Sequence, residues 1–242
     1  MSLWIKICAN TSLADARVAA EAGADAVGFV FAPSPRRVTL EQVAAIVPHL
    51  PPALEKIGVF VDAPFEKIAS TVEACSLTGV QLHWDAPPSL PAQLRERFGP
   101  KLRILGVLHF DAVQVTEESR TVSGDDFSRA ENAKRNEGAL AQGGCFSEPE
   151  IDAILVDSRT TEAVGGTGQI YDWDAARGTI FGADGPMKFV AGGGLTPANV
   201  AEAIATLHPW GVDVVSGVEA APGRKDPAKV RAFIASARAA KK

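Results

Sequence analysis

Residues 4–31, WIKICANTSLADARVAAEAGADAVGFVF, contain a short apolar run, a helical segment and a second apolar run. Trp4–Cys8 and Ala26–Phe31 are rich in apolar, largely β-branched or aromatic side chains, which favour strands. Between them, Ser12–Ala22 is rich in alanine and has helical spacing of its apolar residues. The stretch therefore predicts a strand, a helix and a second strand that pairs parallel to the first.

The same unit recurs along the rest of the chain. Strands are expected at Trp4–Cys8, Ala26–Phe31, Lys56–Val61, Gly79–His83, Arg103–His109, Ala153–Asp157, Lys188–Ala191 and Asp213–Ser216. Helices are expected at Ser12–Ala22, Leu40–Val47, Phe65–Cys75, Pro91–Phe98, Trp173–Ile180, Pro197–Leu207 and Pro227–Ala240. Capping residues explain where two of these helices begin. Thr196 precedes Pro197, and Asp226 precedes Pro227, so each helix has a capping side chain ahead of a first-turn proline.

Eight strands that alternate with helices predict a parallel sheet, and closure into a (β/α)₈ TIM barrel explains why the series ends at eight. An open doubly wound sheet is the structural alternative. It commonly has fewer strands, and no GxGxxG turn follows the first strand here. A single barrel domain over residues 1–242 is therefore expected.

Residues 111–150 interrupt this rhythm, since they are polar, mixed in charge and without sustained apolar periodicity. We expect an insertion or enlarged connection between strands five and six, which would contain the unassigned fifth helix. Such a connection is either a lid or a solvated surface excursion, and long loops are more commonly the latter.

Composition limits the classes of ligand. The net charge of -5 and the pI near 5.4 argue against binding to nucleic acid or to an anionic membrane, so a small-molecule ligand is expected. Cys8, Cys75 and Cys145 are widely spaced and form no CxxC pair, which indicates neither a disulfide framework nor a zinc site. A reducing cytoplasm is the simplest setting for these cysteines. The sequence contains no run of 18 apolar residues, so no membrane span is expected.

Strand periodicity predicts which side chains enter the barrel, because successive side chains point to opposite faces. The apolar members of each strand must meet the helices, so their neighbours face inward. The inward set is Lys6, Cys8, Gln81, His83, Leu155 and Asp157. Lys6 needs a buried partner, and Asp213 in the adjacent last strand is the natural candidate.

Each of these residues alone has a structural explanation: a buried cysteine is usually a small apolar residue, and a histidine or aspartate often satisfies a turn. Their occurrence together at one end of the predicted barrel favours a functional role. Cys8, His83 and Asp157 all end their strands, at the face where barrel enzymes carry their chemistry.

Glycines follow the last two strands, at the usual phosphate site of this fold. Gly192-Gly193-Gly194 comes directly after the seventh strand, and Ser216-Gly217 comes after the eighth. Glycines let backbone N–H groups approach an anion closely. A phosphorylated small-molecule substrate is the resulting expectation.

Many short segments together resemble the phosphoribosylanthranilate isomerase family. They are Lys6-Ile7-Cys8, residues 22–31, Ser34-Pro35-Arg36, residues 58–61, Val80-Gln81-Leu82-His83, Val156-Asp157-Ser158, residues 165–168, residues 193–197 and residues 211–219. The resemblance covers nearly everything except residues 111–150. The chain departs from it at Ala9 and Trp84, where the family usually has glycine, and at residues 10–12.

The resemblance implies an Amadori rearrangement in tryptophan biosynthesis that needs no metal and no organic cofactor. It assigns Cys8 as general base, Asp157 as general acid and Arg36 as the clamp on the anthranilate carboxylate. It also places the substrate phosphate on Gly193, Gly194, Ser216 and Gly217. His83 is added as a substrate-binding candidate because of its position at the strand end. Asp157 would have to hold a proton near neutral pH, and Lys6 would assist formation of the Cys8 thiolate.

Two other functions stay open at this point. The histidine-pathway isomerase of the same fold runs the same rearrangement on a substrate with two phosphates, but it resembles a duplicated half-barrel with carboxylates in both catalytic roles. A non-catalytic sugar-phosphate-binding barrel would be expected to lack the acid or the base. The sequence gives no expectation for the oligomeric state.

Overall fold

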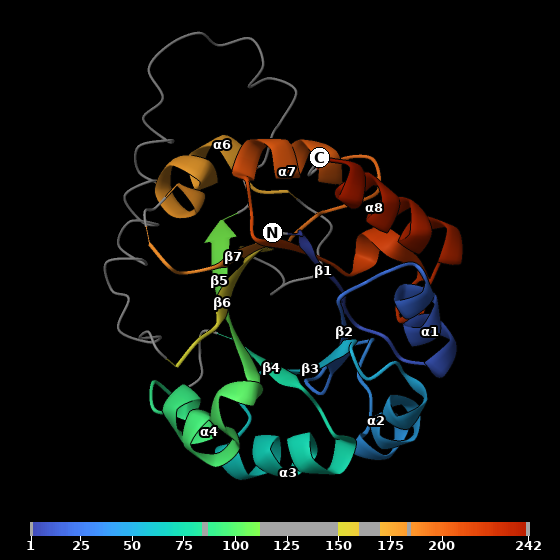
Figure 1. Ribbon diagram of the computed structural model, residues 1–242, viewed down its shortest axis with the longest axis vertical. Coiled ribbons are helices and arrows are strands. Elements are labelled where there is room, and N and C mark those ends of the chain that lie inside the picture. Colours follow the sequence, from blue (N-terminus) through green and yellow to red (C-terminus); the bar gives the residue numbers. More distant parts are fainter. Residues whose placement is uncertain (1, 84–86, 112–149, 160–169, 183–184, 241–242) are drawn as a thin grey trace, which may run out of the picture.

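The computed structural model describes residues 2–83, 87–111, 150–159, 170–182 and 185–240. Within them, eight parallel strands close into a barrel in sequence order, and helices lie outside the ring of strands (Figure 1). The strands are β1 (Trp4–Ile7), β2 (Ala26–Val30), β3 (Glu55–Phe60), β4 (Gly79–Leu82), β5 (Arg103–Asp111), β6 (Ala153–Arg159), β7 (Phe189–Ala191) and β8 (Gly211–Val214). The predicted TIM barrel is confirmed, and the open doubly wound alternative is excluded by the pairing of β1 with β8.

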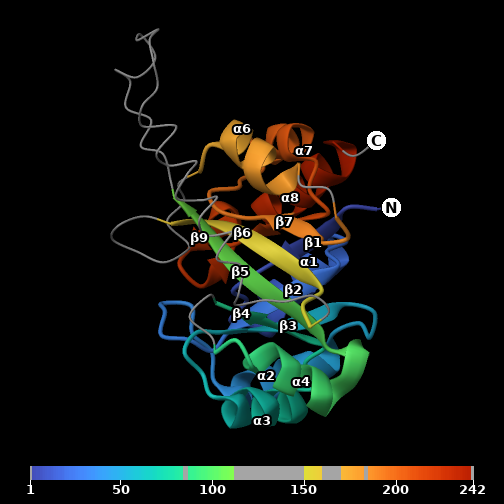
Figure 2. The same ribbon diagram turned by 90° about the vertical axis from the view of Figure 1, so that its left-hand side faces the viewer.

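The helices around the barrel match the predicted series. They are α1 (Leu13–Glu21), α2 (Leu40–Ile46), α3 (Phe65–Cys75), α4 (Leu90–Phe98), α6 (Trp173–Ala176), which runs into a π-helix at Arg177–Phe181, α7 (Val200–Leu207) and α8 (Pro227–Ala240). Short 3₁₀ helices lie at Val47–His49, Gly99–Lys101 and Ser216–Val218, and a small hairpin of β9 (Glu219–Ala221) and β10 (Arg224–Lys225) follows β8. Seen from the side, β5 and β6 run the length of the barrel (Figure 2).

Some predictions fall on residues that the structure does not describe. Most of the insertion at residues 111–150, including its expected helix, lies outside the described residues, as do Trp84 and Cys145. Among the described helices, none is long and apolar enough to cross a membrane.

Side-chain caps explain where several helices begin. Ser12 Oγ accepts from the backbone N–H of Asp15 at the start of α1, and Thr39 and Gln42 form a reciprocal capping box at α2. The cap predicted at Asp226 is confirmed, because its carboxylate accepts from the N–H groups of Ala228 and Lys229.

The start predicted for α7 is three residues early, although Thr196 Oγ1 accepts from the N–H of Ala198 at 3.3 Å as predicted for a cap. Asn199 bonds back to the chain before it, its Oδ1 accepting from Thr196 N and its Nδ2 donating to the Gly194 carbonyl. These bonds hold residues 197–199 in a turn, so the helix begins at Val200 rather than at Pro197.

Two apolar layers stabilise the barrel. One lies between strands and helices and contains Ile5, Ile7, Val80, Leu82 and Val156. The other fills the barrel interior below the mouth, which is the end of the barrel where the strands end. It contains Trp4, Ala26, Ile57, Leu105, Val107, Ala153, Leu155 and Val190, with Trp210 packed against it. The predicted outward and inward faces of β1, β4 and β6 are therefore confirmed.

Candidate active site

Cys8 lies immediately after β1, where the chain is fixed on both sides. Its N–H donates to the Val214 carbonyl at 2.9 Å, and the N–H of Asn10 donates to the Gly28 carbonyl at 2.9 Å. Ala9 between them has a φ of 60°, the left-handed region that glycine adopts most readily. Gly28 makes room for the sulfur, because a Cβ there would lie 2.5 Å from Cys8 Sγ.

A buried ion pair lies just below the mouth. The Lys6 ammonium donates to Asp213 Oδ1 at 3.0 Å and to Gln81 Oε1 at 2.8 Å, and the Lys6 side chain is fully buried. Lys6 and Asp213 are direct partners in the β1–β8 register. The predicted pair across the first and last strands is therefore confirmed.

The pair acts electrostatically on Cys8. Burial alone would lower the pKa of Lys6, but Asp213 and Cys8 raise it above its usual value, so Lys6 stays cationic. Burial raises the pKa of the Cys8 thiol, and the Lys6 charge offsets only part of that effect. The expected assistance from Lys6 has the right sign, but it is outweighed by desolvation. In the free protein at neutral pH, Cys8 is mostly a thiol.

Asp157 lies in β6 and faces the mouth. Burial, followed by repulsion from Asp213, raises the pKa of Asp157 to about 7, although one of its oxygens accepts the Ser158 N–H at 2.9 Å. At neutral pH a large fraction of this carboxyl group therefore carries a proton. Such a group can donate a proton where an ordinary aspartate cannot.

Close packing requires glycine in the loops after β7 and β8. Gly193 and Gly194 have φ values of 71° and 65°, and a Cβ on Gly193 would lie 2.5 Å from Ser158 N. A Cβ on Gly217 would overlap the Leu195 carbonyl oxygen, so no other residue fits between the two loops.

Both loops line one pocket together with the acid. Its lining residues are Asp157, Gly193, Gly194, Leu195, Asp213, Val214, Val215 and Ser216. Four predicted site residues, Asp157, Gly193, Gly194 and Ser216, thus meet in one place. The ion pair of Lys6 and Asp213 influences the pKa values of both Cys8 and Asp157, so the base and acid candidates share one electrostatic environment.

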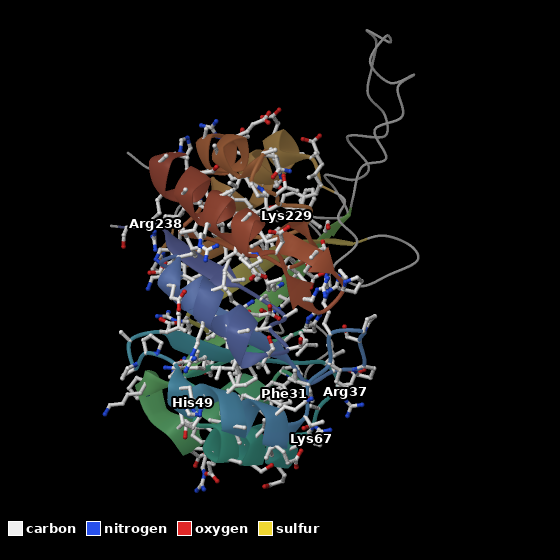
Figure 3. The ribbon with its side chains drawn as sticks, turned by 90° about the vertical axis from the view of Figure 1, so that its right-hand side faces the viewer. Phe31, Arg37, His49, Lys67, Lys229 and Arg238 are labelled. Carbon is white, nitrogen blue, oxygen red and sulfur yellow. The ribbon has the colours of Figure 1, made fainter. Side chains whose placement is uncertain are left out.

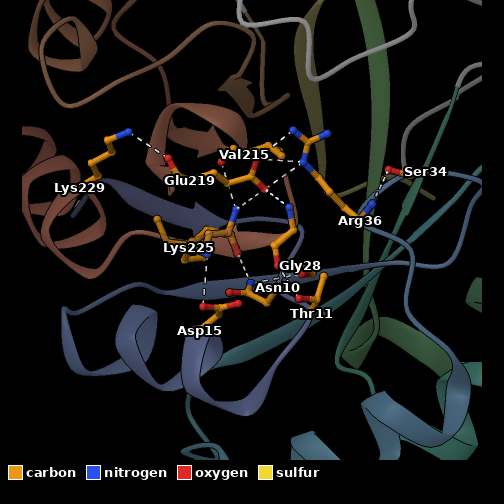
Figure 4. A network of polar contacts seen from close by, with 12 residues as sticks. Asn10, Thr11, Asp15, Gly28, Ser34, Arg36, Val215, Glu219, Lys225 and Lys229 are labelled. Atoms are coloured by element: carbon orange, nitrogen blue, oxygen red, sulfur yellow. Dashed lines mark hydrogen bonds and ion pairs between the residues drawn. The ribbon is translucent and has the colours of Figure 1, made fainter. Parts of the chain in front are cut away.

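Arg36 lies in the loop after β2 and already has a carboxylate partner (Figure 4). Its Nε and Nη2 donate to Glu219 at 2.9 Å each, in a two-pronged pair. Its neighbour Arg37 is exposed (Figure 3), which favours Arg36 as the arginine of the site. Sequence reasoning assigned no role to Glu219 or to the buried Lys225 beside it.

His83 follows β4 and lies beside His109 of β5, with ring centroids 5.4 Å apart. His109 was also missed. Strand parity alone could have found it, because it lies two residues beyond the inward-facing Val107.

The family model described as N-(5'phosphoribosyl)anthranilate (PRA) isomerase matches residues 5–236. N-(5'-phosphoribosyl)anthranilate isomerase of Pelobacter propionicus is 40% identical over 231 residues, which cover 95% of this chain and 93% of the relative. The Geobacter sulfurreducens protein of the same name is 39% identical, with 97% and 98% coverage.

Solved structures give the same result. Phosphoribosyl anthranilate isomerase from Thermotoga maritima superposes with a TM-score of 0.75 and 34% identity, covering 98% of this chain and 99% of that one. A structure of such an isomerase in complex with reduced 1-(o-carboxyphenylamino)-1-deoxyribulose 5-phosphate has a TM-score of 0.71 and 32% identity, with the same coverage.

Proposed function

The chain belongs to the N-(5'-phosphoribosyl)anthranilate isomerase family, and from this premise we propose that it isomerises phosphoribosylanthranilate with Cys8 as general base and Asp157 as general acid. The observation that carries the proposal is the pocket in which Asp157, with a pKa of about 7, lies beside two glycine loops. One bound sugar phosphate could then contact both Asp157 and the backbone N–H groups of the glycine loops.

The acid acts first. Asp157 donates its proton to the ring oxygen of the ribose, the C1–O bond breaks, and the anthranilate nitrogen supplies the electron pair that makes a protonated Schiff base. A carboxyl group with a pKa near 7 suits this step, because it is protonated at working pH yet gives the proton up readily.

The base completes the rearrangement. The Cys8 thiolate removes the proton from C2, and the C–H electron pair moves to neutralise the iminium nitrogen, which gives an enol-amine that tautomerises to the ketone. Because its pKa is raised, the thiolate is scarce but strongly basic. Lys6 stabilises this anion and therefore supports the proton transfer.

The remaining residues bind the substrate. The N–H groups of Gly193, Gly194 and Gly217 and the Ser216 residue take the 5-phosphate, since closely approached backbone donors favour an anion. Arg36 takes the anthranilate carboxylate, because a guanidinium matches it in a forked pair. His83 lies at the mouth and is proposed to contact the substrate.

The proposal includes a reducing, cytoplasmic setting, because Cys8 and Cys75 are free thiols and a catalytic base must stay reduced. The direct test is a fluorescence assay of phosphoribosylanthranilate consumption by the purified protein. Turnover that is abolished by Asp157→Asn supports the proposal. Failure of micromolar wild-type protein to consume the substrate would overturn it.

A further inference from the structure

Glu219 is the centre of a polar network built by the segment after β8 (Figure 4). Besides Arg36, its Oε1 accepts from Gly223 N at 3.2 Å and lies 3.5 Å from Lys225 Nζ. Its backbone carbonyl accepts from Lys229 Nζ at 2.9 Å. Only 4% of the Glu219 side chain is exposed, so it is a built-in part of the mouth rather than a surface acid.

The network leaves one edge of Arg36 unused. Glu219 takes Nε at 2.9 and 3.1 Å and Nη2 at 2.9 Å, which occupies the side edge of the guanidinium. Among the described residues, Nη1 donates no hydrogen bond. A guanidinium held by one edge still presents a second pair of parallel N–H groups, and this is the geometry that a second carboxylate requires.

Lys225 prevents Glu219 from moving. The Lys225 side chain is fully buried, its Nζ donates to the Val215 carbonyl at 3.1 Å, and its backbone N–H donates to Asp15 at 3.3 Å. If Glu219 left its place, it would leave a buried cation without its counter-charge, which is costly. The carboxylate of Glu219 is therefore fixed before any substrate arrives.

We infer that Glu219 is a positioning residue that sets the specificity of the site for a carboxylate-bearing substrate. It holds Arg36 by one edge so that the other edge binds the carboxylate, and Lys225 locks this arrangement. The inference rests on the proposed function, which assigns Arg36 to the substrate carboxylate. A purely structural tie between the loops after β2 and β8 would stabilise the fold without affecting carboxylate recognition.

The test compares two stable ligands in binding to the full chain. One is reduced 1-(o-carboxyphenylamino)-1-deoxyribulose 5-phosphate, and the other is its phenylamino counterpart, which lacks the carboxylate. In wild type the first should bind more tightly. Glu219→Gln should weaken it by ~10-fold or more, as expected when an arginine that binds an anion loses its anchor, and should change the second by less than ~2-fold. With substrate, KM should rise while kcat changes little.

A matched control is available at the opposite end of the barrel. Glu55 binds Arg103 in the same two-pronged way, at 2.6 and 2.7 Å. Glu55→Gln should affect stability without changing the ratio of the two ligand affinities. In an Arg36→Ala background, Glu219→Gln should have no further effect on that ratio, because the group it positions is gone.

Each outcome decides between the proposals. If wild type binds neither ligand, the proposed function and this inference both fail. If wild type prefers the carboxylate ligand and Glu219→Gln keeps that preference, only the inference is overturned. Should Glu219→Gln fail to fold, Glu219→Asp retains the charge opposite Lys225 but shortens the reach to Arg36. It should still reduce the preference, and an unchanged preference in that variant would count equally against the inference.

Discussion

The two ends of the barrel interior are built from different chemistry. At the end where the strands begin, Trp4 stacks on Trp210 with ring centroids 5.2 Å apart, in the same apolar layer as Leu155. Two residues further along the same face of β6, Asp157 opens the polar mouth. Figure 3 shows both ends, with Arg37 on the mouth side and Arg238 on the opposite side.

The difference teaches how the mouth obtains its reactivity. Desolvation is the largest cause of the raised pKa values of both Cys8 and Asp157. The interior apolar layer beneath them excludes water from below, and the buried Lys6–Asp213 pair lies between that layer and the mouth. The apolar layer therefore stabilises the fold. This stability offsets the cost of keeping the charged groups at the mouth away from water.

The largest expected effect follows from replacing the proposed acid or the proposed base at the mouth. Asp157→Asn should lower kcat by ~10²-fold or more with little change in KM, because a general acid acts in the transition state. Cys8→Ala should do the same through loss of the base. Steady-state kinetics with phosphoribosylanthranilate measure both.

Leu155→Ala is the control from the lower end. It should cost ~2–5 kcal/mol in the free energy of unfolding by leaving a cavity, while kcat below the melting transition stays within a few-fold of wild type. A Cys8→Ala protein with near-normal turnover would contradict the assignment of the base.

The second effect tests the Lys6–Asp213 ion pair between the interior apolar layer and the mouth. Lys6→Met should lower the free energy of unfolding by ~3–5 kcal/mol, because it leaves the Asp213 carboxylate buried without a partner. Replacing Asp213 by Leu in the same chain should recover part of the loss. Denaturant titration measures both variants.

Lys188 provides a lysine control from the other end. It lies over the Trp210 ring at 5.1 Å, and its removal should cost only ~0.5–1 kcal/mol. Equal losses for Lys6→Met and Lys188→Met would mean that the interior pair is no more demanding than a surface contact.

The third effect is the pH dependence of kcat/KM. In the proposed mechanism Asp157 acts when protonated and has a pKa of about 7, whereas Cys8 acts when deprotonated and has a pKa above its ordinary value. Below pH 7 the fraction of Asp157 that is protonated is nearly constant, and the fraction of Cys8 that is thiolate rises about tenfold per pH unit, so kcat/KM rises. Between the two pKa values the changes cancel, and above the pKa of Cys8 the rate falls. The rising limb near pH 7 therefore reports the acid.

Lys6→Met sharpens this test. It removes the charge that lowers the pKa of Cys8, so the falling limb should move to higher pH while the rising limb responds less. A wild-type profile that falls steadily from pH 7 without a plateau would contradict the order of the two pKa values.

The sequence predicted the barrel and its faces because both depend on local periodicity. The expected start of β8 was two residues late, since it begins at Gly211 rather than Asp213. The position of the first strand residue does not change the pairing register, so Asp213 still lies opposite Lys6. The start of α7 failed for a different reason: side-chain bonds from Asn199 to Thr196 and Gly194 accompany a turn at residues 197–199, and spacing does not reveal these bonds.

The network around Arg36 could not be predicted in the same way. Glu219 lies 183 residues after Arg36, and only closure of the barrel brings the loops after β2 and β8 together. The dipeptide Pro222-Gly223 is typical of turns, and Gly223 has a φ of 78°, but a turn does not tell which acid it buries. Contacts between distant loops depend on tertiary structure that residue spacing does not contain.

The smallest expected effect concerns Ala9, which joins the reactive Cys8 to Asn10 at a positive φ. Ala9→Gly removes left-handed strain of ~1–2 kcal/mol. It also adds ~0.5–1 kcal/mol of unfolded-chain entropy and loses the burial of one methyl group, about 0.8 kcal/mol. These terms nearly cancel, so the free energy of unfolding should stay within ~1 kcal/mol of wild type. Turnover should stay within ~2-fold, because the hydrogen bonds of Cys8 N and Asn10 N fix the chain on both sides. Ala9→Val, which is β-branched at the same φ, should be clearly less stable than wild type. A large drop in kcat for Ala9→Gly with the fold intact would show that the strain at residue 9 itself aims the thiol.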